Sequence, residues 1–208
     1  MIGMMIKIQK AMSRILKKSP LVTSFIIKAA LAYCILSMAF SFTGVFLSAA
    51  EKGPVPNPLG SLTAKEVIGH VAWGLVAGAA TLSLRYTILA GLFAALIDSD
   101  HIIGFTRLDA LVRMSHSISF GIISVIVLMV LFGKRDYRLG AIAFGGMLSH
   151  ISFDTFADYD GKFPILTPFY NHQISFAHID WIYFEIAAVL IVGIATIFTR
   201  NKELKITS

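Results

Sequence analysis

The chain has 208 residues, of which 56% are hydrophobic and only 14% are charged, and its formal net charge is +6. Soluble domains average roughly 45–50% apolar and 25% charged residues, so this composition favours lipid over water as the surroundings. A single cysteine, Cys34, excludes an intramolecular disulfide and a zinc site built from several cysteines.

Apolar runs along the chain are long enough to cross a membrane. A hydrocarbon core about 30 Å thick requires roughly 20 helical residues at about 1.5 Å each. Six stretches reach or approach that length: residues 29–49, 67–84, 86–97, 117–132, 139–157 and 181–198. We therefore predict an all-α fold, a polytopic membrane helix bundle of about six transmembrane helices.

The basic residues are distributed as in a membrane protein rather than a nucleic-acid-binding one. If the chain crosses the membrane six times, 13 of the 18 Lys and Arg residues lie on the side of both termini. Cytoplasmic loops carry such an excess, so we expect a multi-pass protein of the cytoplasmic (inner) membrane with both termini in the cytoplasm and no nucleic-acid partner. The alternative for residues 29–49, a cleaved signal peptide, is disfavoured because its apolar core spans only about 7–15 residues.

Composition divides the chain into three segments. Residues 1–28 form a basic amphipathic N-terminal segment, residues 29–200 a transmembrane helical domain, and residues 201–208 a cytoplasmic tail. Residues 51–62 contain three prolines and two glycines, which predicts an outer loop. Residues 105–114 alternate apolar and charged residues at helical spacing, and we expect a short amphipathic helix at the outer interface.

All six histidines fall in the outer half of this topology, together with several aspartates. Imidazole nitrogen and carboxylate oxygen are ligands that suit zinc, manganese or iron. The candidate metal ligands are His70, Asp98, Asp100, His101, His116, His150 and Asp154. We predict that they bind one or two divalent transition-metal ions, with zinc preferred and manganese or iron as alternatives.

Depth and spacing support a shared site. His150 lies 11 residues beyond Leu139, about 17 Å along a helix from the cytoplasmic side. An ionisable group at that depth costs several kcal/mol unless it is paired, bound to a metal or hydrated. Asp154 follows His150 at i, i+4, so both side chains share a helix face. Asp98 and His101, at i, i+3, would share a face if the third helix continues through them.

The order of these clusters resembles the YdjM-like family of inner-membrane proteins over roughly residues 65–170. The matching positions are Gly69, His70 and Gly74, the segment Leu96-Ile97-Asp98-Ser99-Asp100-His101, then Ser115-His116-Ser117, Gly146-Met147-Leu148-Ser149-His150, Asp154, Gly161, Leu166 and Pro168. The resemblance implies a membrane-bound metal-dependent hydrolase, and some members of the family are regulated by the SOS repressor. The family usually has H-R-G-x-T-H-S where this chain has Leu111-Val112-Arg113-Met114-Ser115-His116-Ser117. One family position is therefore lost here, or its role is supplied by His172 or His178.

Together these features predict a hydrolase that cleaves a phosphoester in a lipid or lipid-linked substrate at the outer membrane face, with membrane lipids as partners. A carboxylate not bound to metal, Asp98 or Asp154, would act as general base. Arg113 would hold the phosphate, since guanidinium matches phosphate oxygens bidentately; its alternative role is that of an arginine snorkelling to the interface. No H-E-x-x-H or G-x-S-x-G pattern is present, which disfavours a zinc protease and a serine hydrolase.

Two other functions fit part of the pattern. A metal-ion or ion-coupled transporter also places His and Asp inside the membrane. Its pathway would need polar groups in the inner halves of the helices, but residues 76–84, 122–131 and 186–197 carry no charge. Haem bound by two histidines would leave Asp98, Asp100 and Asp154 without a role.

Overall fold

The computed structural model describes residues 2–47, 53–54, 63–133, 136–157 and 161–207. Its α-helices are α1 (Ile2–Phe42), α3 (Ala64–Ala79), α4 (Leu84–Leu96), α5 (Ile118–Phe132), α6 (Tyr137–Phe156) and α7 (Trp181–Thr207). Three 3₁₀-helices are η1 (Thr43–Val45), η2 (Ile97–Thr106) and η3 (His178–Asp180). Two short antiparallel pairs join β1 (Gly53–Pro54) to β2 (Asp109–Ala110) and β3 (Lys162–Phe163) to β4 (Ile174–Ser175).

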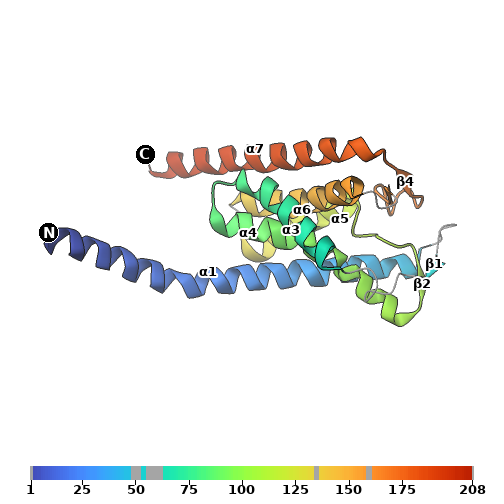
Figure 1. Ribbon diagram of the computed structural model, residues 1–208, viewed down its shortest axis with the longest axis horizontal. Helices are drawn as coiled ribbons and strands as arrows, with labels where there is room; N and C mark the ends of the chain where they lie inside the picture. The colour runs from blue at the N-terminus through green and yellow to red at the C-terminus, as the bar shows by residue number, and fades with distance from the viewer. Residues whose placement is uncertain (1, 48–52, 55–62, 134–135, 158–160, 208) are drawn as a thin grey trace.

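The helices lie side by side along one long axis (Figure 1). Helix α6 contacts α3, α4, α5 and α7, whereas α1 packs on α4, α5 and η2. Both chain ends lie at the same end of the bundle, and the short strands lie at the other. The predicted all-α bundle is confirmed, and each predicted span corresponds to one helix of the structure.

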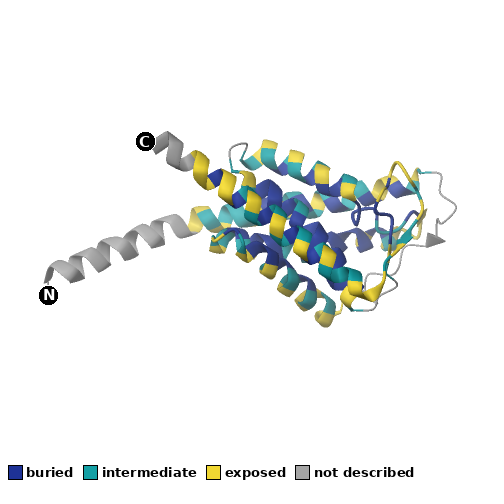
Figure 2. Cartoon of the chain, turned by 90° about the horizontal axis from the view of Figure 1, so that it is seen from above, coloured by how far each residue is buried: buried dark blue, intermediate teal, exposed yellow. Residues whose placement is uncertain are grey.

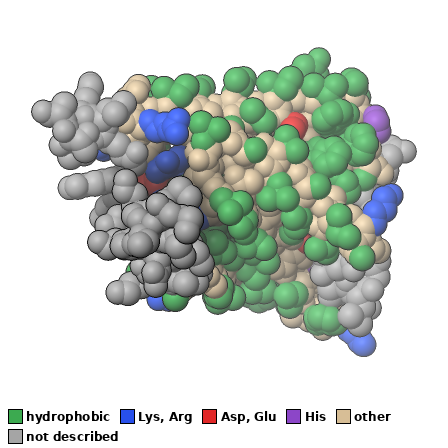
Figure 3. Space-filling model, turned by 60° about the vertical axis from the view of Figure 1, so that its left-hand side comes forward, with side chains coloured by type: hydrophobic (Ala, Val, Ile, Leu, Met, Phe, Trp, Pro, Cys, Tyr) green, Lys and Arg blue, Asp and Glu red, His purple; other side chains and the backbone are tan. Residues whose placement is uncertain are grey.

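The helix surface has the composition of a membrane protein. Three segments are long and apolar enough to cross a membrane, Pro20–Val45, Leu84–Thr106 and His178–Lys202, and Ile118–Phe132 is a shorter apolar helix. Large apolar side chains such as Leu31, Ile126 and Leu190 are more than half exposed. In Figure 3 hydrophobic side chains cover the middle of the face shown, and Lys and Arg lie toward its ends. So extensive an apolar surface fits lipid rather than water.

Small residues allow close helix packing where the histidines lie. A Cβ added to Gly74 of α3 would lie 2.4 Å from the Ala90 carbonyl oxygen of α4. On α6, a Cβ at Gly146 would lie 2.9 Å from the Cβ of Phe93. Close approach through small residues is a main source of helix association in lipid. It holds α3 and α6 against α4, with His70 one turn from Gly74 and His150 one turn from Gly146.

An aromatic layer crosses the bundle next to the histidines. Tyr33 of α1 stacks on Phe93 of α4, with ring centroids 4.3 Å apart, and meets the edge of Phe120 of α5 at 5.3 Å. All three side chains are fully buried. The Tyr33 hydroxyl donates a hydrogen bond to the Ala143 carbonyl of α6, at 3.0 Å. Figure 2 shows buried residues running through the middle of the bundle, in keeping with this layer.

At the end of the bundle that carries the chain termini, Asp136 joins α4 to α6. Its carboxylate accepts hydrogen bonds from the Tyr86 hydroxyl at 2.6 Å and from Arg138 Nε at 2.8 Å. It also caps α6 by accepting from the Arg138 backbone N–H. Partial burial raises the pKa of Asp136, but the hydrogen bonds from Arg138 and Tyr86 outweigh it and hold that pKa below its ordinary value.

One local expectation differs from the structure. Residues 105–114 do not form a helix: η2 ends at Thr106, Arg107 takes the left-handed φ of 55°, and β2 follows. Left-handed residues break a helix, and Arg113 has a φ of 61°. The N-terminal segment of residues 1–28 is helical from Ile2 onward and continues without a break to Phe42 as helix α1. The predicted loop 51–62 lies outside the described residues, except for 53–54.

Candidate metal centre

All seven predicted ligands lie together inside the bundle, near the end opposite the chain termini. His70 comes from α3, Asp98, Asp100 and His101 from η2, His116 from the turn before α5, and His150 and Asp154 from α6. Each is at most 8% exposed. Helical spacing within each segment and the close contacts of α3 and α6 with α4 together produce this convergence.

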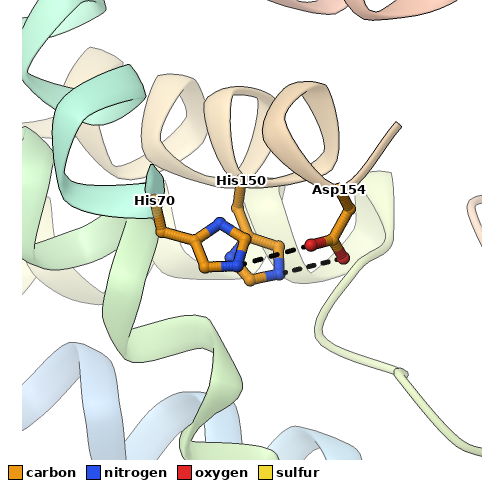
Figure 4. Close-up of side chains that lie close together, drawn as sticks. All are labelled: His70, His150 and Asp154. Atoms are coloured by element: carbon orange, nitrogen blue, oxygen red, sulfur yellow. Dashed lines mark ion pairs between the residues drawn. The ribbon is translucent and has the colours of Figure 1, made fainter. Parts of the chain in front are cut away.

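Helices α3 and α6 supply the part of the cluster drawn in Figure 4. His70 Nε2 lies 3.3 Å from Asp154 Oδ1, and His150 Nε2 lies 3.5 Å from Asp154 Oδ2. The two imidazole rings stack with centroids 3.8 Å apart. One carboxylate therefore faces two imidazoles, with one oxygen toward each.

The 3₁₀-helix η2 brings Asp98 and His101 onto one face. A 3₁₀-helix has three residues per turn, so side chains at i and i+3 eclipse. His101 Nε2 lies 3.5 Å from Asp98 Oδ1. The other oxygen, Asp98 Oδ2, lies 3.3 Å from His70 Nε2. The predicted shared face is present, but a 3₁₀-helix provides it instead of a continued α-helix.

The hydrogen bonds of His150 leave one ring nitrogen for the cluster. Its Nδ1 lies 2.7 Å from the Ala94 carbonyl oxygen. Because a carbonyl only accepts, Nδ1 carries the hydrogen, and in the neutral ring Nε2 has a lone pair. His150 Nε2 lies 2.8 Å from His116 Nε2. A backbone carbonyl that fixes one ring nitrogen while the other points into a cluster is typical of metal-binding histidine.

Two serines hold Asp100. The hydroxyls of Ser41 on α1 and of Ser115 donate to Asp100 Oδ2 at 3.1 and 2.8 Å. Ser41 Oγ in turn accepts from the Ser115 backbone N–H at 3.0 Å. The remaining oxygen, Asp100 Oδ1, is buried and has no hydrogen bond. Ser41 lies far from the clusters in sequence and was not among the predicted site residues.

This donor set fits a divalent metal. Three groups of His and Asp residues in the described part of the chain have ligand atoms within 4.8 Å of one another. Asp100 Oδ1 and Asp154 Oδ2 are buried without a hydrogen bond, which is costly for a carboxylate in a dry interior. Coordination of a metal by Asp100 Oδ1 and the imidazole nitrogens would satisfy the first oxygen, and a water held at the site would donate to the second.

Arg113 lies beside the cluster. Its Nη2 is 3.5 Å from Asp154 Oδ2, and its guanidinium lies 5.3 Å from the centre of the Phe163 ring. It also borders a small cavity of about 20 Å³, which is lined by Ser41, Asp100, His101, Ile103 and residues 110–113. Arg113 therefore has access both to the carboxylates and to this cavity.

His172 and His178 do not join the cluster. The His178 Nε2–H donates to the Phe156 carbonyl at the end of α6, at 2.9 Å. The exposed His172 packs its ring against Tyr170. Neither belongs to a group of close donors in the described residues.

A buried glutamate was missed. Glu185 of α7 is 8% exposed, and neither of its carboxylate oxygens has a hydrogen-bond partner of good geometry. The hydroxyls of Ser149 and Ser152 lie beside it, on another face of α6 from His150. The signal was available, because Glu185 is the single acidic residue within the apolar stretch 181–198.

The family model that describes YdjM inner membrane proteins matches residues 66–207. The match covers all seven residues of the cluster and helices α4 to α7, but not α1 with Ser41. No curated protein and no solved structure matches the chain.

Proposed function

Because the chain belongs to the YdjM inner membrane protein family, we propose that its His and Asp cluster is the metal centre of a hydrolase acting on a phosphoester. The substrate is a lipid or lipid-linked molecule, and the site faces the extracytoplasmic side of the membrane. The observation that carries the proposal is the burial of seven His and Asp side chains in one cluster beside an arginine.

In the proposed reaction, different residues of the cluster have different roles. A divalent metal, zinc first, would polarise a phosphoryl oxygen and lower the pKa of water that it binds. His70 and His150 would hold it through Nε2, and the Ala94 carbonyl keeps His150 in the required tautomer. Asp154 Oδ2, which has no hydrogen bond, would accept the proton of the attacking water as general base.

Arg113 would bind the phosphate. Guanidinium pairs with phosphate oxygens through two parallel hydrogen bonds. Its Nη2 already lies 3.5 Å from an anionic oxygen of Asp154, and the Phe163 ring supports the guanidinium plane. Arg113 lines the same small cavity as Asp100 and His101, so a phosphate oxygen bound by Arg113 would lie beside the cluster.

A lipid substrate is supported by the surroundings of the site. Ile102, Phe105 and Leu108 are 47%, 58% and 41% exposed in and just after η2, which contributes Asp98 to the cluster. These exposed apolar side chains support a site beside hydrocarbon, which a lipid headgroup would reach without leaving the bilayer.

The test is metal content and phosphoester hydrolysis of the detergent-purified protein. We expect at least one equivalent of zinc, manganese or iron per chain, together with hydrolysis of a phospholipid or lipid phosphate. His150→Ala and Asp154→Ala should lose both, whereas His172→Ala, which removes a histidine outside the cluster, should lose neither. Protein prepared without chelators that holds no stoichiometric metal would contradict the proposal.

A transporter is the alternative, and Glu185 is the observation that favours it. Besides the cluster, Glu185 places a buried ionisable side chain on α7, and such side chains within spanning helices mark ion pathways. The test is metal uptake into proteoliposomes. Uptake by the wild type that is lost in Glu185→Gln would favour the transporter function over the hydrolase function.

A further inference from the structure

We propose that the cluster binds two metal ions and that Asp98 bridges them. This inference rests on the metal site of the proposed function and specifies how many ions the site holds and which residues share them.

The number of donors exceeds the needs of one ion. Zinc usually takes four protein or water ligands, and other divalent transition metals take up to six. The cluster offers seven residues in three groups, and the group of Asp98, His116 and His150 overlaps the other two. His70, His150 and Asp154 form one group, while Asp98, Asp100 and His101 form another. None of these close groups in the described residues contains both His70 and His101.

Asp98 faces both groups, with a different oxygen toward each. Its Oδ2 lies 3.3 Å from His70 Nε2, and its Oδ1 lies 3.5 Å from His101 Nε2. A carboxylate with one oxygen toward each of two donor groups has the arrangement of a bridging ligand. Ions that share such ligands in two-metal sites lie about 3.5–4 Å apart.

The two halves differ in their surroundings. The first consists of His70, His150 and Asp154, with Asp98 Oδ2, and it lies between α3 and α6. The second consists of Asp100 and His101, with Asp98 Oδ1. Asp100 and His101 also line the small cavity of about 20 Å³. Asp100 Oδ1 is buried without a hydrogen bond and lies 3.9 Å from His101 Nε2.

His116 lies between the two halves. Its Nε2 is 2.8 Å from His150 Nε2 and 4.0 Å from Asp98 Oδ1. It therefore serves as the imidazole of either ion. Because the second half borders the cavity, we expect its ion to exchange faster and to be the one that meets the phosphate.

The first measurement needs no variant. The apoprotein is titrated with Mn²⁺, and its electron paramagnetic resonance spectrum is recorded at each addition. Two ions so close together are spin-coupled, so we expect a coupled signal that saturates at two Mn²⁺ per chain. Saturation at one Mn²⁺, with the spectrum of an isolated ion, would overturn the two-metal inference and leave the proposed hydrolase standing.

Variants then assign the halves. His101→Ala should bind one Mn²⁺ and give an uncoupled signal, and His70→Ala should lower the affinity for the first ion by at least about 10-fold, the effect usual for metal-site changes. His172→Ala is the matched control and should keep two coupled ions. Two coupled ions in His101→Ala would also overturn the inference, whereas wild type that binds no metal would overturn the proposed function itself.

Discussion

The two oxygens of Asp100 have opposite surroundings, and this asymmetry identifies Ser41 as a positioning residue. Two hydroxyls donate to Oδ2, so Oδ1 is directed away from them without a hydrogen bond. Ser41 belongs to α1, outside the residues that the family model matches. A helix beyond the matched region thus orients a carboxylate of the cluster.

Ser41→Ala should weaken metal binding without abolishing it. Loss of a hydrogen bond to a ligating carboxylate typically reduces metal affinity by about 10–100-fold. The affinity is measured by competition with a chelator of known strength. Ser124→Ala is the control, because its hydroxyl only bonds the Gly121 carbonyl within α5. Equal affinities for Ser41→Ala and wild type would show that Asp100 needs no such support.

Glu185→Gln should leave the stability of the protein unchanged or raise it by on the order of 1 kcal/mol. A buried carboxylate whose oxygens have no hydrogen bond of good geometry gains little from its charge, and an amide of nearly equal volume avoids the cost of burying that charge. Thermal unfolding in detergent measures the effect. A clear loss of stability in Glu185→Gln would reveal a partner that depends on the negative charge.

Local spacing was sufficient to predict which His and Asp residues lie together, but not the serines that position them. His150 and Asp154 share a helix face at i, i+4, and such pairs are visible in any sequence. Ser41 and Ser115 meet Asp100 only because α1 packs against η2, a contact between residues 59 positions apart in the case of Ser41. Serines in apolar segments are common and carry no signal of their own.

At the scale of elements, the close contact of α3 with α4 controls where His70 lies. Gly74→Val should destabilise the protein by about 1–3 kcal/mol, because its side chain would collide with the Ala90 carbonyl and the Ala94 Cβ. Gly193→Ala is the control, since nothing lies within 4 Å of its added Cβ. The unfolding temperatures of the two variants are compared in detergent. Equal midpoints would mean that α3 can move away from α4 without a loss of stability.

Asp136 should make stability depend on acid pH. Its pKa in the folded protein is lowered, so the ionised form stabilises the fold above the unfolded-state pKa of about 3.9, and this contribution is lost as the pH falls through the folded-state pKa. We expect Asp136→Asn to have a lower Tm than wild type at pH 7, with the difference shrinking below about pH 4. A difference that stays constant with pH would exclude the ionised carboxylate as its cause.

The apolar runs predicted each α-helix of the described residues, but the spacing of residues misread two connections. Residues 105–114 have helical spacing, yet left-handed residues at Arg107 and Arg113 stop a helix, and β2 pairs with β1 instead. The 3₁₀ geometry of η2 was equally hidden, because apolar spacing does not separate a 3₁₀-helix from the end of an α-helix. Both features depend on contacts with distant segments.

For the whole molecule, the excess of basic residues predicts which end of the bundle faces the cytoplasm. In a Cys34→Ser background, Phe169→Cys lies in the exposed segment near the site, and Lys202→Cys lies on α7 near the C-terminus. A membrane-impermeant maleimide should label Phe169→Cys in right-side-out vesicles and Lys202→Cys only in inverted ones. The reverse pattern would place the site in the cytoplasm.

The aromatic layer has a consequence for the cell's energy supply. A hydrolase within the bilayer must admit water to its site, and a continuous file of water would let protons cross. Tyr33, Phe93 and Phe120 are fully buried one to two helical turns beyond the cluster, and the Tyr33 hydroxyl is already bonded to the Ala143 carbonyl. The hydrogen of that hydroxyl is therefore not available to a file of water, and the rings fill the space around it. We infer that the layer keeps water out of the middle of the bundle, which would let the proposed chemistry proceed on one side of the membrane without discharging its potential.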